Sequence, residues 1–310
     1  MRKLYFCFII ISNIWLSGCT HSPKGYIKSV NSYSIKNDQP IYLYFTQEKV
    51  ELIGVVKSSS KSGNSTDMLY VGATPLDFFA GIIAHGIVAE SIKNSNKNKI
   101  QENANKNIEP YINLIQDIKN SDLTRKYLVN KPSKYTFIHY SENNINIHND
   151  SLVLEITPIF LMNENQNTLI LRNLFTIFKK NQINKSLKKR KVIYQNQIEV
   201  FSQETTSDSI YKYWTKNNGE NIKTQLYNLF SLSVNILSKQ INSKGKKYTS
   251  ENIQYFNGTD YTFERSQIIE INCDRIIIKT LRGWIKSIPT QRLKNIPHKC
   301  SNQLIKADVS

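Results

Sequence analysis

The sequence predicts an α+β fold, with a mixed or largely antiparallel sheet and two to three helices packed on one side. Short runs rich in β-branched and aromatic residues recur between positions 41 and 203, which is typical of strands. Two longer stretches, 107–118 and 218–244, repeat apolar residues every three or four positions, as helices do. Further strand-like runs follow between 268 and 288.

The composition is that of a folded protein with a strong positive charge. The chain has 310 residues, of which 40% are hydrophobic and 11% aromatic, so it can bury the core of one large domain or two modest ones. These values exclude a disordered or collagen-like chain. Lys and Arg number 41 against 24 Asp and Glu, a net charge of +17, which favours anionic partners or surfaces.

In the first half of the chain, strands are predicted at 41–45, 50–56 and 68–71. The stretch 76–92 is apolar and predicts a helix too short to cross a bilayer. It is either a core helix or one that dips into a membrane or mediates oligomerisation. A second helix is predicted at 107–118, with Pro110 near its first turn.

The second half begins as a β-meander. Strands are predicted at 135–140, 152–161, 169–178 and 191–203. A helix at 218–244 follows, with an apolar stripe that includes Ile222, Leu226, Leu229, Phe230 and Val234. Three short strands are predicted to complete the sheet, at 268–271, 275–279 and 284–288.

The N-terminus has the organisation of a secretory signal. Met1–Lys3 is positively charged, and the next 12 residues are apolar, too few for a membrane-spanning helix. The following Leu16-Ser17-Gly18-Cys19 resembles the lipobox of bacterial lipoproteins. The alternative is an ordinary cleaved signal, or an uncleaved anchor, that happens to contain Cys19.

The lipoprotein resemblance implies the chemistry of Cys19 and the location of the chain. It implies a signal peptide at 1–18, diacylation of the Cys19 thiol, cleavage before it and membrane anchoring through the acyl chains. Thr20, in place of the Asp that retains lipoproteins in the inner membrane, then indicates the periplasmic face of the outer membrane in a Gram-negative host. A polar tether is predicted at 19–39, followed by one envelope domain at 40–310 with a possible internal boundary near 120–134.

Two cysteines remain after the signal peptide and Cys19 are set aside. Cys273 and Cys300 would lie in an oxidising compartment, where a disulfide between them is expected. Two unpaired buried thiols are the alternative, and a metal site would need more ligands than the nearby His298 supplies.

One segment carries positive charge without any acidic residue. Between positions 179 and 191 it contains Lys179, Lys180, Lys185, Lys188, Lys189, Arg190 and Lys191. Such a cluster next to a membrane favours binding to anionic headgroups. The alternative is a hairpin tip that is merely kept soluble by its charge.

The sequence contains no motif of a serine hydrolase, a zinc peptidase or a nucleotide-binding enzyme. We therefore predict a non-enzymatic, lipid-anchored envelope component that acts through contacts with a protein partner. The alternative is binding or transfer of an anionic lipid or glycan through segment 179–191 and an apolar groove; a periplasmic hydrolase ranks third. No cofactor, metal ion or nucleic-acid partner is predicted.

Overall fold

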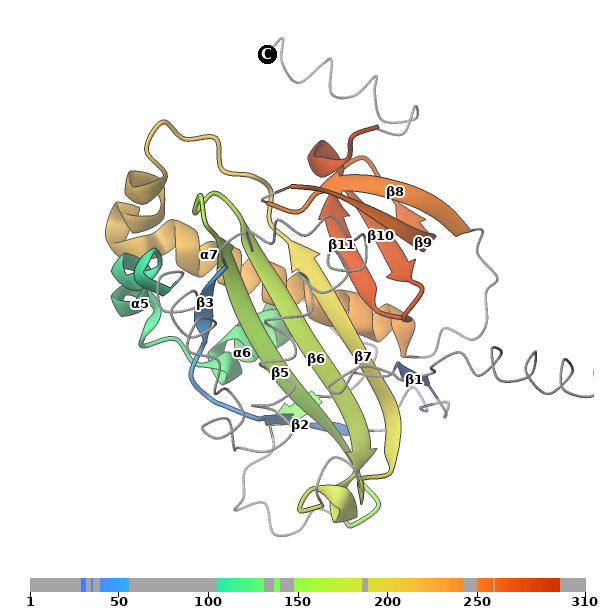
Figure 1. Ribbon diagram of the computed structural model, residues 1–310. Helices are drawn as coiled ribbons and strands as arrows, with labels where there is room; N and C mark the ends of the chain where they lie inside the picture. Colours follow the sequence, from blue (N-terminus) through green and yellow to red (C-terminus); the bar gives the residue numbers. More distant parts are fainter. Residues whose placement is uncertain are drawn as a thin grey trace, which may run out of the picture.

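The computed structural model has an α+β fold with a mixed sheet (Figure 1). It describes residues 29–31, 35, 40–55, 105–130, 137–139, 148–185, 189–241, 250–258 and 260–295. The predicted signal peptide, strand 68–71 and helix 76–92 lie outside these ranges, as do Cys19, Lys188 and Cys300.

Three long antiparallel strands form the middle of the sheet. They are β5 (Leu152–Asn163), β6 (Leu169–Lys179) and β7 (Val192–Phe201). Every residue of β5 is buried, so both of its faces are covered. This double burial explains its nearly continuous apolar sequence, since apolar and polar residues would alternate along a strand with one solvent-exposed face.

Shorter strands extend the sheet from β5. Both β2 (Ile41–Phe45) and β3 (Leu52–Val55) run parallel to β5, and β4 (Phe137–His139) runs parallel to β2. A two-residue strand, β1 (Val30–Asn31), pairs with β7. These parallel pairs make the sheet mixed.

The other end of the sheet is a C-terminal meander. It consists of β8 (Ser250–Phe256), β9 (Tyr261–Ile271), β10 (Arg275–Thr280) and β11 (Ile285–Pro289), each antiparallel to the next. The last of them, β11, joins the main sheet by pairing parallel with β7. The resulting order is β4-β2-β5-β6-β7-β11-β10-β9-β8.

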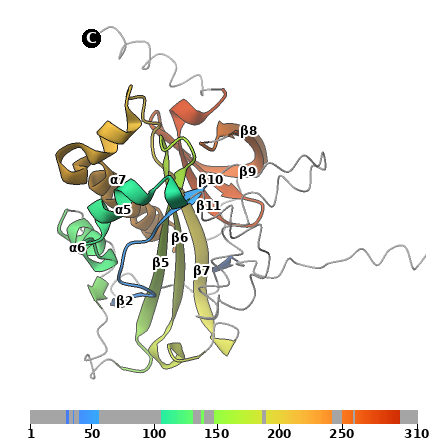
Figure 2. The same ribbon diagram turned by 60° about the vertical axis from the view of Figure 1, so that its left-hand side comes forward.

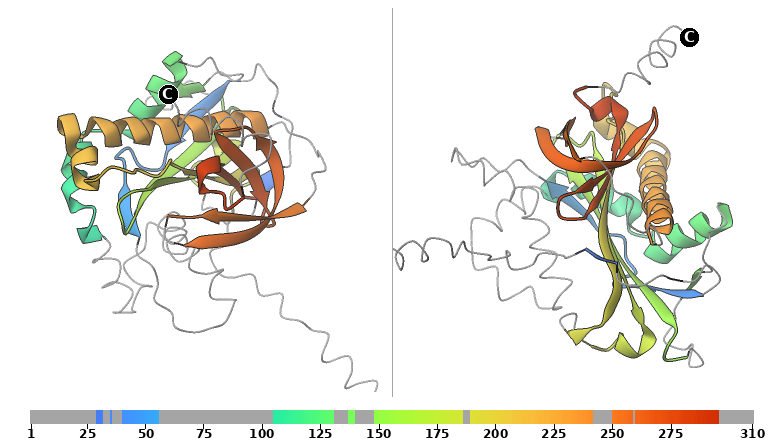
Figure 3. Two further views of the ribbon diagram at one scale, coloured as in Figure 1. Left: turned by 90° about the horizontal axis from the view of Figure 1, so that it is seen from above. Right: turned by 90° about the vertical axis from the view of Figure 1, so that its right-hand side faces the viewer.

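Three helices accompany the sheet in the described residues. Helix α7 (Ile210–Gln240) packs on β6 and β7, while α5 (Glu109–Ile115) and α6 (Asn120–Asn130) pack on α7 (Figure 3). The prediction at 107–118 contains α5. Helix α6 was not predicted because its sequence is mostly polar; it occupies the stretch in which an internal boundary was placed. No helix in the described ranges has both the length and the apolar character needed to cross a bilayer.

Two hydrophobic clusters cover opposite faces of the central strands. One lies beneath α7 and includes Phe160, Phe175 and Phe230; the other lies beneath the meander and includes Leu161 and Tyr255. Alternation along each strand sends successive side chains to the two clusters. The central strands are therefore the partition between the helices and the meander (Figure 2).

The structure also differs from the prediction in the tether and in two strands of the meander. The stretch predicted as a tether contains β1 and the buried Ile35, so the folded part includes residues before Pro40. Strand β8 was not predicted, because only its second half is apolar. Strand β9 begins seven residues earlier than the predicted 268–271, since its first half alternates exposed and half-buried positions.

Helix α7 is interrupted where the predicted helix begins. Backbone angles leave the helical region from Lys216 to Gly219, and three consecutive residues have positive φ: 49° at Asn217, 55° at Asn218 and 78° at Gly219. Asn and Gly are the residues that tolerate this conformation best. A Cβ atom on Gly219 would lie 2.9 Å from Leu114 Cβ, so glycine also allows α5 to approach α7 closely.

Replacing Gly219 should therefore lower stability without loss of any side-chain contact. We expect Gly219→Ala to reduce the free energy of unfolding by about 1–3 kcal/mol, because alanine is strained at this φ and clashes with Leu114. Denaturant titration of the purified chain measures this. Asn218→Gly is the matched control and should not destabilise; equal losses in both variants would contradict the explanation.

Candidate functional site

Strand β9 presents two different faces, and this alternation defines the candidate site. Tyr261, Phe263 and Arg265 are exposed, while the intervening Glu264 is only partly exposed and turns toward the main sheet. Period-two alternation assigns the first three side chains to the outer face of the meander. The inner face carries charged groups, and the outer face carries exposed aromatic ones.

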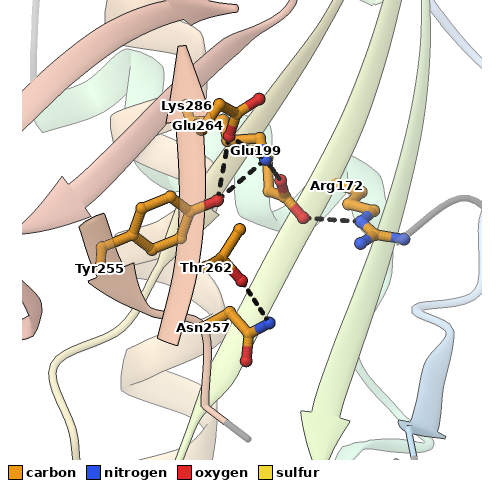
Figure 4. A network of polar contacts seen from close by, with 7 residues as sticks. All are labelled: Arg172, Glu199, Tyr255, Asn257, Thr262, Glu264 and Lys286. Atoms are coloured by element: carbon orange, nitrogen blue, oxygen red, sulfur yellow. Dashed lines mark hydrogen bonds and ion pairs between the residues drawn. The ribbon is translucent and has the colours of Figure 1, made fainter. Parts of the chain in front are cut away.

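The inner face holds a cluster of four charged side chains and one phenol (Figure 4). Lys286 of β11 is at its centre: its Nζ atom lies 2.7 Å from Glu264 Oε2 and 3.5 Å from Glu199 Oε2. Arg172 Nε donates to Glu199 Oε1 at 2.7 Å. Two cations thus face two carboxylates, and the cluster has no net charge.

Tyr255 completes the cluster from β8. Its hydroxyl accepts a hydrogen bond from Lys286 Nζ at 2.9 Å and donates one to Glu264 Oε2 at 3.1 Å. The five residues come from β6, β7, β8, β9 and β11, so these interactions connect the main sheet to three of the four strands of the meander. Asn257 and Thr262 close the β8–β9 hairpin beside the cluster with a 2.9 Å hydrogen bond.

The pKa values favour the charged pairs and a neutral phenol. Burial raises the pKa of Glu199, but the charges of Arg172 and Lys286 outweigh this effect and leave that pKa below its usual value. Burial lowers the pKa of Lys286, yet the groups around it hold that pKa well above its usual value. Burial also raises the pKa of Tyr255. The cluster is therefore suited to holding strands together, and the phenol is a poor base at neutral pH.

A second polar clamp holds the end of the meander. Arg292, in the 3-10 turn η3 (Thr290–Arg292), is only 3% exposed. It donates to the Ser202 carbonyl oxygen at 2.9 Å and to Thr168 Oγ1 at 2.7 Å. Burial lowers the pKa of Arg292 to about 10, so the side chain stays cationic at neutral pH. Arg292 thus ties the meander to the central strands at a point separate from the charged cluster.

The outer face of the meander exposes large apolar side chains. Phe263 is 72% exposed and Tyr261 56%, and Leu281, which follows β10, is 73% exposed. Tyr261 packs on Phe256 with ring centroids 5.7 Å apart. We call Tyr261, Phe263 and Leu281 the outer apolar patch. Exposed Arg265 and Lys279 lie on the strands that carry it.

The predicted basic segment forms the tip of the β6–β7 hairpin, which includes the 3-10 turn η1 (Lys180–Gln182). Lys185, Lys189 and Lys191 are exposed, and Lys180 is half-buried. Lys179 Nζ lies 2.7 Å from Asp150 Oδ1, with both side chains more than half exposed.

Arg190 differs from the lysines of this segment because it is inside the hairpin. Its Nη1 atom pairs with Glu155 Oε2 at 2.8 Å, and both side chains are 7% exposed. Its Nη2 atom donates to the carbonyl oxygens of Ile183 and Lys185, and the guanidinium lies 4.2 Å from the centre of the Phe178 ring. Arg190 therefore stabilises the tip and is not available to an anionic surface.

The two remaining groups of predicted site residues are only partly described. Cys273 is disulfide-bonded, and the Thr290 hydroxyl donates to its carbonyl oxygen at 2.6 Å. The pairing with Cys300 and the lipidation of Cys19 stay predictions, since both residues lie outside the described ranges. Where side chains are described, no three His, Cys, Asp or Glu residues converge as metal ligands.

The sequence analysis missed the charged cluster, although a signal for it was present. Arg172 and Glu199 each interrupt a run of apolar residues in a predicted strand. A charge in a doubly covered strand needs a partner, which indicates pairing across the sheet. Lys286 and Tyr255 give no such signal, because their strands are short or partly polar.

Comparison of the chain with known protein families, with curated protein sequences and with solved structures found no match.

Removing the carboxylate that Arg172 and Lys286 share should destabilise the fold. We expect Glu199→Gln to lower the free energy of unfolding by about 3–5 kcal/mol, because two buried cations lose their common anion. The pKa of Glu199 is lower in the folded state than its ordinary value of 4.5. The stabilisation is therefore complete at pH values above 4.5 and is lost as the pH falls through the lower, folded-state pKa. The variant should accordingly lose less stability on acidification, which denaturation at a series of pH values measures.

The control for this variant is Glu270→Gln. Glu270 pairs with Lys239 at 2.8 Å, but the two side chains are 38% and 60% exposed, so the loss should stay below about 1 kcal/mol. Similar losses of unfolding free energy in the two variants would contradict the conclusion that the charged cluster stabilises the fold.

Arg190 and Lys189 should respond differently to the same substitution. Arg190→Ala leaves Glu155 buried without its cation, and we expect a loss of about 3 kcal/mol or more. Lys189→Ala removes an exposed charge and should change stability by no more than about 0.5 kcal/mol. Thermal unfolding of both variants measures this, and equal melting temperatures would show that Arg190 does not stabilise the tip.

Proposed function

We propose that this chain is a lipid-anchored, periplasm-facing envelope lipoprotein that acts without catalysis, as an accessory or assembly component that binds a protein partner. The lipobox resemblance at Leu16–Cys19 supports the anchor, and the absence of hydrolase and nucleotide-binding motifs supports a binding role. We also propose that the folded part of the chain, from β1 onward, forms one domain with its helices gathered on one face of a largely antiparallel sheet.

The observation that carries the binding role is the outer apolar patch. Phe263 and Leu281 are each more than 70% exposed, although a folded strand and its turn hold them in place. Aromatic side chains on a rigid support are typical anchors of protein interfaces. The charged cluster below fixes β9, so a partner would meet a preformed surface and pay little ordering entropy.

The charges around the patch indicate the chemistry of the partner. Arg265 and Lys279 are exposed on its two strands. A partner with an apolar centre and an acidic rim fits this surface, because opposite charges at a rim accelerate association and select orientation. The alternative of lipid or glycan transfer through an apolar groove stays a prediction.

Site-specific crosslinking in the native host tests this function. A photoreactive residue in place of Phe263 should give one discrete crosslinked protein, whereas the same residue in place of Lys216, an exposed position on α7, should give none. Phe263→Glu should remove co-purification of that protein while leaving the melting temperature unchanged within about 2 °C.

The anchor is tested in the same cells. The native chain should fractionate with membranes and carry acyl chains on Cys19 by intact-mass analysis, and Cys19→Ser should be released from them. An unmodified Cys19 thiol would contradict the anchor. Equal crosslinking from positions 263 and 216 would contradict the partner surface.

A further inference from the structure

We propose that the tip of the β6–β7 hairpin rests on an anionic bilayer surface, where its exposed lysines contact lipid phosphates. The proposal depends on the proposed function, since the acylated Cys19 would bring the chain to a membrane. It adds an orientation: the hairpin tip is the end of the protein that faces the lipid.

The hairpin tip and the meander lie at opposite ends of the long central strands (Figures 1 and 3). Register supports this arrangement, because Leu152 pairs with Lys179 at the tip end, while Met162 pairs with Leu169 at the other end. The parallel pairing of β11 with residues 198–200 joins the meander to the second half of β7. A bilayer at the tip would therefore leave the outer apolar patch accessible to a partner.

The charge of the tip suits phosphate headgroups. Lys185, Lys189 and Lys191 are exposed, and the segment 179–191 contains no acidic residue. Asp150 pairs with Lys179 and offsets one charge of the region. Glu155 is neutralised by Arg190 inside the hairpin, so it does not offset the positive charge of the exposed lysines.

Arg190 gives the tip a defined shape. By bonding to the carbonyl oxygens of Ile183 and Lys185, it holds the chain on either side of the turn together. Lys185 and Lys189 thus lie on or next to backbone that Arg190 holds, and less conformational entropy is lost when they contact a surface than in an unstructured loop. One arginine of the basic segment shapes it, and the lysines make the contact.

The length of chain between the anchor and the fold permits this orientation. Cys19 and Ser29 are ten residues apart, which allows a span of at most about 33–36 Å. Asn31 pairs with Tyr194, three residues and therefore about 10 Å along the strand from Lys191. The acyl anchor and the hairpin tip can thus reach one bilayer together, and the anchor would raise the effective concentration of lipid at the tip.

Vesicle co-sedimentation tests the contact separately from the anchor. The full-length chain carrying Cys19→Ser would be mixed with vesicles of phosphatidylcholine alone or of phosphatidylcholine with phosphatidylglycerol. We expect binding only to the anionic vesicles, with an affinity that falls as salt is added. Reversing three exposed charges, in Lys185→Glu/Lys189→Glu/Lys191→Glu, should weaken binding by about tenfold or more.

A matched variant controls for net charge. Lys106→Glu/Lys212→Glu/Lys216→Glu makes the same charge change at exposed positions away from the tip and should weaken binding by less than about threefold. Melting curves of all variants verify that they fold. Equal weakening by both triple variants would overturn the proposal, because binding would then follow total charge. Equal binding to neutral vesicles, or none to anionic ones, would also overturn it.

The two proposals can fail independently. If the native acylated chain binds neutral vesicles but the Cys19→Ser chain does not bind anionic ones, the proposed anchor is supported and the proposed tip contact is wrong. If the Cys19 thiol is unmodified in the host while the tip lysines still determine binding to anionic vesicles, the tip contact holds and the anchor is wrong.

Discussion

The fold depends on one constraint: charged side chains inside a doubly covered sheet must find opposite charges there. Glu155, Arg172 and Glu199 all lie on the face of the central strands opposite α7. Unpaired, each would carry a desolvation cost of several kcal/mol. Glu155 pairs with Arg190 at one end, and Glu199 pairs with both Arg172 and Lys286 toward the other. Charge pairing thus shapes both the hairpin tip and the meander.

The same pairing explains how one sheet carries two unlike surfaces. At the tip, Arg190 pairs with the buried Glu155, so the cations that remain exposed are lysines. In β9, Glu264 turns inward to Lys286, so its neighbours Phe263 and Arg265 must point outward. Each exposed surface therefore lies next to an internal ion pair.

The sequence predicted the elements whose own pattern is strong. Strands β2, β5, β6 and β7 are runs rich in apolar residues, and the part of α7 after Gly219 repeats apolar residues every three or four positions. Helix α6, strand β8 and the first half of β9 were missed because much of their sequence is polar. The charged cluster was missed for a different reason: Glu199 and Lys286 become neighbours only through the parallel pairing of β7 with β11. Arg190 looked like a surface cation because a sequence cannot distinguish it from adjacent lysines.

The parallel pairing of β7 with β11 also governs the order in which the sheet can be completed. Ile198 pairs with Ile285, which is synthesised only after all of α7 and three further strands. Until then the second half of β7 presents unsatisfied backbone groups, the kind of edge that recruits strands from other chains. A chain truncated after α7 would keep that edge permanently, so proteolytic fragments ending there would be prone to self-association. In the described residues, β11 is the strand that satisfies this edge of β7.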